Sequence, residues 1–290
     1  MFSEGDVVMN ANSADFERLE GGRRLGGVTP WTLEGAARVT IITVVFNDAA
    51  HLQRTIDSIA SQTYKNIEHI IIDGRSTDGT LEIIKRCTSI DYWLSEGDRG
   101  IYDAMNKGVC CSTGEWINFM NSGDVFFNEI VVEDVFLNCE SRVADLIYGD
   151  VEVDYGGFKK LRRAGVVASL KQGMQFSHQS LFAKRSVLLE LGFDLSYRTA
   201  ADYNFIVSSW VKQYRFERLE LVVSSISAGG VSDLRRLDSH NQRVGILSSH
   251  LELTRADKVR MFWQGLYIRV ADVLKSVLPV RLTDWIKRSK

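Results

Sequence analysis

The sequence is poor in the residues and patterns that define several large classes of protein. Of its 290 residues, two are proline and four are cysteine. The cysteines form no C-x-x-C pair and no cluster with histidine, so we expect reduced thiols of a cytosolic protein and no structural zinc site. No apolar stretch reaches the ~18–20 uninterrupted residues of a membrane-spanning helix, and the N-terminus lacks the pattern of a secretory signal. We therefore expect a protein that is soluble or lies on a membrane without crossing it.

The charge balance and the first turn exclude further classes. The net charge of −2 gives no general attraction to nucleic acid. No G-x-G-x-x-G motif follows the apolar run Val39–Phe46, which argues against a dinucleotide-binding oxidoreductase. The turn Asn47-Asp48-Ala49-Ala50 contains no glycine and no basic residue to hold a triphosphate, so a nucleotidyltransferase is also disfavoured. The apolar content of 45% is that of an ordinary globular protein with one large domain or a domain plus an appendage.

The hydrophobic pattern predicts an α/β fold. The β-branched run Val39–Phe46 is typical of a strand covered on both faces, and Leu52, Ile56 and Ile59 then recur at helical spacing before the next buried run, Ile67–Ile72. Such a strand, helix and strand predict parallel pairing with a right-handed crossover. Short strands and a hairpin turn at residues 154–158 follow later, so we expect a mixed, mostly parallel sheet flanked by helices.

One strand end carries the residues around which the site is predicted. The run from Trp116 to Met120 stops at Asn121 and Asp124, with Gly123 between them. Open α/β sheets bind their ligands at the carboxyl ends of strands, and a carboxylate beside an amide oxygen suits a hard divalent cation. The alternative from these residues alone is an ordinary turn that closes a strand.

The two ends of the chain differ from its centre. Residues 1–38 contain six glycines and little apolar periodicity, which predicts a mobile leader before a domain at residues 39–250. Residues 251–290 are predicted to form a basic amphipathic helical tail, since residues 255–290 hold nine Lys/Arg and three Asp, a net charge of +6. Such a helix can lie on an anionic membrane, here the inner face of the plasma membrane, or pack on the domain or on a second subunit of a homo-oligomer.

Taken together, these segments resemble the family 2 glycosyltransferases of the GT-A fold, from Val39 to about Val231. The subgroup most similar acts in bacterial exopolysaccharide and O-antigen assembly. The motifs that carry the resemblance occur in the family's order: Val44-Val45-Phe46-Asn47-Asp48, Ile72-Asp73-Gly74-Arg75-Ser76-Thr77-Asp78-Gly79-Thr80, Ser95-Glu96-Gly97-Asp98-Arg99-Gly100-Ile101-Tyr102-Asp103-Ala104-Met105-Asn106-Lys107-Gly108, Thr113-Gly114-Glu115, Asn121-Ser122-Gly123-Asp124 and Ala201-Asp202-Tyr203.

The resemblance implies a role for each of these positions. It makes Asp124 the ligand of Mn²⁺ or Mg²⁺, Asp202 the catalytic base, and His178 a residue on the acceptor side. It assigns Asp73 to the donor's base and Asp98 to its nucleoside or sugar. The implied nucleotide-sugar site as a whole comprises Thr43, Phe46, Asn47, Asp73, Ser76, Asp98, Lys107 and Asn121. The family usually has two carboxylates at the metal position, and this sequence has one, which leaves the ion more dependent on the diphosphate.

The implied activity is an inverting transfer of a sugar from a nucleotide diphosphate to a hydroxyl of a saccharide or polyprenyl-linked acceptor, in cell-surface polysaccharide synthesis. The cation would neutralise the departing diphosphate, and Asp202 would remove the proton from the attacking hydroxyl. Alternatives remain for single residues, because Asp202 could cap a helix and His178 could be an ordinary core histidine. For the whole protein, the alternative is a catalytically silent scaffold that binds nucleotide sugars.

Overall fold

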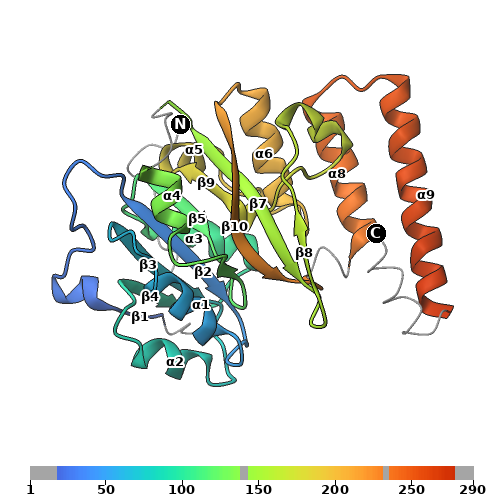
Figure 1. Ribbon diagram of the computed structural model, residues 1–290. Helices are drawn as coiled ribbons and strands as arrows, with labels where there is room; N and C mark the ends of the chain where they lie inside the picture. Colours follow the sequence, from blue (N-terminus) through green and yellow to red (C-terminus); the bar gives the residue numbers. More distant parts are fainter. Residues whose placement is uncertain (1–17, 138–142, 231–234, 278–290) are drawn as a thin grey trace, which may run out of the picture.

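The computed structural model describes residues 18–137, 143–230 and 235–277. They form one ten-stranded sheet in the order β1-β4-β3-β2-β5-β9-β7-β10-β6, with β8 paired to β7, and helices lie on both faces (Figure 1). The strands are β1 (Leu19–Gly21), β2 (Val39–Val45), β3 (Ile67–Asp73), β4 (Tyr92–Ser95), β5 (Trp116–Phe119), β6 (Val125–Phe126), β7 (Leu146–Asp154), β8 (Lys159–Arg162), β9 (Leu181–Lys184) and β10 (Phe216–Ser227). The α-helices are α1 (Leu52–Ala60), α2 (Thr80–Arg86), α3 (Ile101–Cys111), α4 (Val131–Leu137), α5 (Arg185–Leu191), α6 (Ala201–Val211), α8 (Arg236–His250) and α9 (Arg255–Val277), and 3₁₀ turns are η1 (Arg23–Gly26), η2 (Val167–Gln172) and η3 (His178–Ser180).

The predicted parallel half of the sheet is confirmed. β4, β3, β2 and β5 are parallel neighbours, and every residue of β2 is buried. Side chains alternate between the two faces of a strand, so Ile42 and Val44 pack under α3, while Val45 packs with α1 and α2. Burial of each such side chain contributes about 1.5–3 kcal/mol, which explains the run of β-branched residues.

The second half of the sheet is mixed, as predicted. β9 lies antiparallel between β5 and β7, β10 is parallel to β7, and β6 is antiparallel to β10. The predicted hairpin joins β7 to β8, with Gly156 at a φ of 80° in its turn. The carboxyl ends of the parallel strands therefore meet the start of β9 and the start of α6 near the centre of the sheet.

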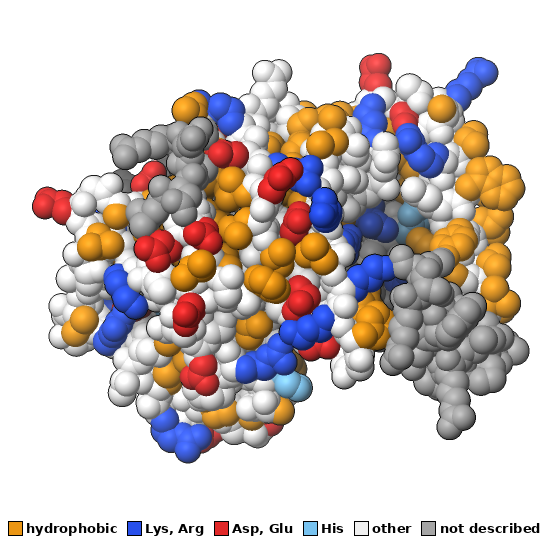
Figure 2. Space-filling view, in the orientation of Figure 1, with side chains coloured by type: hydrophobic (Ala, Val, Ile, Leu, Met, Phe, Trp, Pro, Cys, Tyr) orange, Lys and Arg blue, Asp and Glu red, His pale blue; other side chains and the backbone are white. Residues whose placement is uncertain are grey.

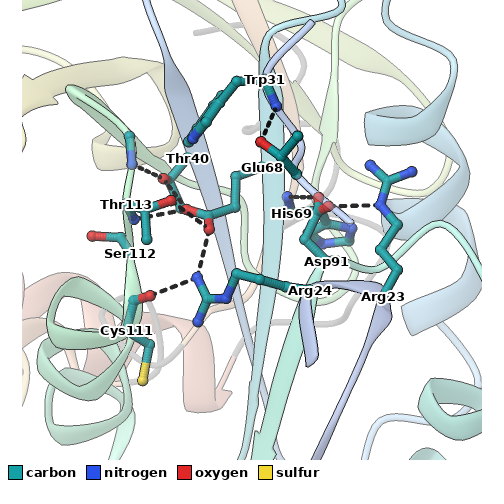
Figure 3. Close-up of polar contacts among 12 residues, drawn as sticks. Arg23, Arg24, Trp31, Thr40, Glu68, His69, Asp91, Cys111, Ser112 and Thr113 are labelled. Carbon is teal, nitrogen blue, oxygen red and sulfur yellow. Dashed lines mark hydrogen bonds and ion pairs between the residues drawn. The ribbon is translucent and has the colours of Figure 1, made fainter. Parts of the chain in front are cut away.

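Part of the segment predicted as a mobile leader is instead attached to the sheet; residues 1–17 lie outside the described part. β1 pairs antiparallel with β4, and Arg24 reaches Glu68 of β3, with 2.5 Å between Nη1 and Oε1 (Figure 3). Glu68 is fully buried and also accepts hydrogen bonds from Thr40 and Thr113. Glycine content misled the prediction, because two arginines and a strand register, which a composition does not show, hold residues 19–24. This cluster lies at the amino ends of β2 and β3, away from the edge where ligands are expected.

Of the predicted tail at residues 251–290, the structure describes the part up to Val277, and residues 278–290 lie outside the described part. In the described part, α9 (Arg255–Val277) packs on α8 at one end of the molecule (Figure 1). Met261 and Ile268 are buried, and a Cβ at Gly265 would lie 3.1 Å from His240 Nε2, so glycine permits the close approach of the two helices. The opposite face of α9 exposes a continuous apolar stripe made of Val259, Phe262, Trp263, Leu266, Tyr267, Val270, Val273 and Leu274. Among the described helices, none is both long enough and apolar enough to cross a membrane.

Candidate active site

The loops that follow β2, β3 and β4 bring several predicted donor-binding residues together. A Cβ added to Gly74 would lie 2.6 Å from Asp98 Oδ2 and 3.3 Å from Phe46 Cδ2, so both side chains lie against this glycine. Phe46 is 63% exposed, an unusual position for a large aromatic ring on a surface. An exposed ring beside a carboxylate is suited to stacking against a base while the carboxylate accepts a hydrogen bond.

Asn47 and Ser76 join the first two loops. The Asn47 N–H donates to Ser76 Oγ at 2.7 Å, and the Thr77 N–H donates to Asn47 Oδ1 at 2.8 Å. Asn47 has a φ of 50°, in the left-handed region that asparagine tolerates better than most residues. These bonds fix the loop conformation next to Phe46.

Three predicted donor-site residues have internal partners. Asp73 is fully buried, and its carboxylate accepts hydrogen bonds from Ser76 and from Ser95 Oγ, the latter at 2.6 Å. Thr43 is also fully buried, with its hydroxyl 3.1 Å from His69 Nε2, and so lies beneath the edge and not on it. Lys107 forms an ion pair with Glu96 at 2.7 Å. For Asp73, Thr43 and Lys107 the structure therefore shows loop or core contacts, and their contact with a donor stays a prediction.

Asp124 follows β5 in a tight turn, as both the predicted cation site and the alternative of an ordinary strand-closing turn require. The Asp124 N–H donates to Asn121 O at 3.0 Å, and Gly123 has a φ of 89°, which favours glycine. The carboxylate is 8% exposed and accepts hydrogen bonds from Gln179 Nε2 at 2.8 Å and from the Ser227 N–H at 3.3 Å. Burial raises the pKa of Asp124, and the hydrogen bond from Gln179 only partly offsets this effect.

His178 connects this turn to Asp202. Asn121 Nδ2 lies 3.0 Å from His178 Nε2, and His178 Nδ1 lies 3.3 Å from Asp202 Oδ2. Because the amide nitrogen can only donate, Nε2 accepts and Nδ1 donates to the carboxylate. The end of β5 and the start of α6, 81 residues apart between Asn121 and Asp202, therefore share one hydrogen-bonded chain.

Asp202 lies in the first turn of α6 and is not its cap. Ala200 occupies the N-cap position, and Asp202 Oδ1 accepts hydrogen bonds from Tyr102 Oη at 3.0 Å and from the Tyr203 N–H at 2.8 Å. Burial acts to raise the pKa of Asp202, but the hydrogen bonds from His178, Tyr203 and Tyr102 outweigh it and leave the pKa below its ordinary value. The carboxylate is thus held ionised at neutral pH, as a proton acceptor must be.

The residues at the end of β5 are compatible with a divalent cation. Asn121 Oδ1 is buried and accepts no hydrogen bond from any residue that the structure describes. An orphaned amide oxygen in the same turn as a carboxylate is a donor set that Mg²⁺ or Mn²⁺ accepts, provided that other oxygens complete it. Residues 18–137, 143–230 and 235–277 contain no group of three or more His, Cys, Asp and Glu that could hold a metal without such help.

Two residues of this network were not predicted. The hydroxyl of Tyr102, a residue to which the sequence assigned no role in the site, contacts Asp202. Gln179 stands next to His178 in sequence, but a glutamine at a strand start carries no signal that would predict a bond to Asp124. Both contacts depend on how β9 and α3 are placed in space, which local pattern does not reveal.

Comparison with known proteins agrees with this arrangement. The model of a protein family described as Glycosyl transferase family 2 matches residues 40–201, more than half of the chain. The chain belongs to glycosyl transferase family 2. It is 35% identical over 184 residues to an uncharacterized glycosyltransferase of Mycobacterium tuberculosis (strain H37Rv), covering 60% of this chain and 70% of that protein. It is 32% identical over 212 residues to the PGL/p-HBAD biosynthesis glycosyltransferase of Mycobacterium bovis (strain BCG), covering 68% and 80%.

Solved structures establish the GT-A fold of this family 2 member. TarS 1–349 of S. aureus, in complex with UDP-GlcNAc, superimposes with a TM-score of 0.58 at 14% identity and covers 79% of this chain and 71% of that one. The mannosyltransferase PcManGT of Pyrobaculum calidifontis, in complex with GDP-Man and Mn²⁺, gives 0.58 at 17% identity, with 83% and 74% covered. At such identities the likeness concerns the fold, and the site of this chain is argued from its own residues.

Proposed function

We propose that this family 2 glycosyltransferase is an inverting, metal-assisted enzyme that transfers a sugar from a nucleotide diphosphate to a hydroxyl of a saccharide acceptor in cell-surface polysaccharide synthesis. The observation that carries the proposal is the chain Asn121–His178–Asp202, beside the Asp124–Gln179 bond. It brings the candidate metal ligand and the candidate base to one edge of the sheet. The complexes of TarS with UDP-GlcNAc and of PcManGT with GDP-Man and Mn²⁺ support a nucleotide-sugar donor and a divalent ion for a protein of this fold.

In this proposal, each candidate residue at this edge of the sheet has its own binding or catalytic role. Phe46 stacks on the base of the donor, and Asp98 accepts a hydrogen bond from its nucleoside or sugar. Asp124 and Asn121 Oδ1 would hold the cation, which supplies charge neutralisation for the diphosphate when bound. Asp202 accepts the proton of the acceptor hydroxyl from the side opposite the leaving group, which gives inversion, and His178 and Tyr102 keep its carboxylate oriented and ionised.

The test is donor binding followed by product analysis. We expect one member of a panel of UDP-, GDP- and dTDP-sugars to raise the melting temperature in the presence of Mn²⁺, because a ligand of the folded state stabilises it. The anomeric configuration of the product, read by proton NMR, then reports inversion. If no donor releases nucleoside diphosphate in a metal-dependent way, the protein is the nucleotide-sugar-binding scaffold instead.

We further propose that the outer face of α9 lies on an anionic membrane, where it would meet lipid-carried acceptors. Its apolar stripe is flanked by the exposed basic residues Lys258 and Arg269, and Phe262 and Trp263 are 66% and 61% exposed. Apolar area combined with basic flanks is the pattern of interfacial helices.

Flotation with vesicles tests this surface. The full chain is expected to float with phosphatidylglycerol-containing vesicles and less with phosphatidylcholine alone, and Phe262→Asp combined with Val270→Asp is expected to abolish flotation. A chain that floats with neither kind of vesicle would refute the membrane proposal. A dimer that the same double variant dissociates would also refute it and would assign the stripe to a second copy.

A further inference from the structure

An open hollow lies outside the edge described above. It has a volume of about 440 Å³ and is lined by residues of η2, α8 and α9 and by Tyr203 of α6. Figure 2 shows the molecule indented between α9 and the rest of the chain, with basic side chains and a histidine on the wall of the indentation. None of the lining residues that the structure describes lies in the loops after β2 and β3.

The wall of this hollow carries three basic side chains, and one of them has no partner among the described residues. Lys171, Arg243 and Arg260 line it, and none of its described lining residues is Asp or Glu. Arg243 makes no hydrogen bond or ion pair with any residue in the described ranges, and its guanidinium lies 3.8 Å from where a Cβ of Gly173 would be. Arg260 bonds to Asp257, but its Nε is buried and unpaired among the described residues. Arg243 is half-buried and Arg260 Nε is a buried donor without an acceptor, so the wall offers donors and positive charge that an anion in the hollow would satisfy.

The charge state of the hollow follows from its neighbours. Burial lowers the pKa of Arg243, and the nearby Tyr203 and Asp202 act in the opposite direction without restoring it. An arginine remains charged in proteins even so. His240 adds no charge, because burial also lowers its pKa, and its Nε2–H donates to Met261 O at 3.0 Å. The uncompensated cation at the centre is thus Arg243.

The rest of the wall is apolar and leads to the outer surface. Val244, Leu247, Met261 and Ile268 line the hollow, and Trp263 and Tyr267 belong both to the hollow and to the exposed stripe of α9. A ligand that fits this combination has an anionic head and an apolar chain. One lining residue, Tyr203, is the neighbour of Asp202 in α6, and the charge of Asp202 acts on Arg243.

We propose that this hollow binds the phosphate of a lipid-linked acceptor, with Arg243 as its principal ligand and the lipid chain passing over Trp263 and Tyr267. The inference rests on the proposed transferase function, because only a transferase has an acceptor substrate. The proposed function assigns the donor's phosphates to Asp124, which does not line this hollow, so a phosphate bound here would belong to the other substrate. A headgroup held there would present its sugar hydroxyl to the base from the acceptor side.

Direct binding to the full chain tests the proposal without any turnover. The probes are decyl phosphate, inorganic phosphate and decanol, each below its aggregation limit, measured by isothermal titration calorimetry in the absence of donor. We expect decyl phosphate to bind more tightly than either other probe. Arg243→Gln should weaken it at least tenfold, as loss of a charge-assisted hydrogen bond implies. Arg243→Lys should retain part of the affinity.

Lys85→Gln on the exposed side of α2 is the matched control, because it removes one positive charge far from the hollow and should leave decyl phosphate binding unchanged. The proposal is overturned if Arg243→Gln binds decyl phosphate like the unaltered chain, or if Lys85→Gln weakens it equally. Equal affinity for inorganic and decyl phosphate overturns the lipid part. Because no donor is present, these outcomes are independent of whether Asp202 proves to be the base.

Discussion

Replacement of Asp202 by asparagine tests the proposed mechanism most directly, because the structure predicts that it removes the base and little else. The side chain keeps its shape, and an amide oxygen at the Oδ1 position still accepts from Tyr102 Oη and the Tyr203 N–H. The amide nitrogen then faces His178 Nδ1, which carries a hydrogen in the unaltered protein. Two donors meet there, so the imidazole has to change tautomer, and the Asn121 amide has to rotate to match it.

The expected magnitudes differ for folding and for rate. One rearranged buried hydrogen bond costs about 1 kcal/mol, so the folded population should hardly change. Loss of a general base lowers kcat by roughly 10²–10⁴-fold. The donor KM should stay within a few-fold, because Phe46 and Asp98 lie in other loops. Asp194→Asn, on an exposed loop before α6, is the control and should keep full activity.

The assay is nucleoside diphosphate release under saturating acceptor, with donor binding measured separately by thermal shift. A variant that binds donor normally and turns over at more than a tenth of the normal rate would remove Asp202 from the chemistry. The pH profile gives a second check. Since hydrogen bonds hold the pKa of Asp202 below its ordinary value, no acid limb from this group should appear above about pH 4.

Three further predictions concern other parts of the molecule. Asp124→Asn should abolish metal-dependent activity and raise the urea midpoint at pH 7 with EDTA. Burial raises the pKa of Asp124, so its stabilising contribution is complete in acid and is lost as the pH rises through that pKa; an unchanged or lower midpoint would contradict this sign. Phe46→Ala should leave stability within about 0.5 kcal/mol, because the ring is exposed, and raise the donor KM roughly tenfold through lost stacking, as steady-state kinetics would show. Arg24→Ala should destabilise the fold by about 2 kcal/mol, as measured by urea titration. This cost is smaller than that of a typical broken buried ion pair because Thr40 and Thr113 still donate hydrogen bonds to Glu68. Glu68→Gln in the Arg24→Ala background should recover part of the lost stability.

The sequence predicted the layers of the fold better than it predicted the contacts within the site. Parallel pairing of β2, β3 and β5 follows from β-branched runs separated by helical spacing, and Asn121 and Asp124 at a strand end follow from the same local pattern. The contact between Asp124 and Gln179 depends on β9 entering antiparallel beside β5, which no local pattern specifies. Thr43 is buried with the rest of β2, and its hydroxyl contacts His69 of the neighbouring strand, a contact that the pattern of a single strand does not reveal.

The prediction of a mobile N-terminal segment missed the contacts of residues 19–24 for a related reason. Glycine content was taken as evidence of mobility, but Gly21 and Gly22 allow close approach to β4, where a Cβ would lie 2.5 Å from the Trp93 ring and 2.6 Å from Asp91 O. Composition describes the freedom of an isolated chain. The partners that remove this freedom, here Asp91 and Glu68, lie more than 40 residues away.

The orientation of one imidazole links the two ends of the proposed site. His178 Nε2 accepts from Asn121 Nδ2, so the amide presents its nitrogen to the ring and leaves Oδ1 without a partner in the described chain. The same tautomer places the hydrogen on Nδ1, where it holds Asp202 ionised. A cation at Oδ1 therefore favours the amide orientation in which Asn121 Nδ2 donates to His178 Nε2 and the ring hydrogen lies on Nδ1, facing Asp202. This coupling predicts that His178→Phe weakens Mn²⁺ binding as well as turnover, because a phenyl ring can neither accept a hydrogen bond from Asn121 Nδ2 nor donate one to Asp202 Oδ2.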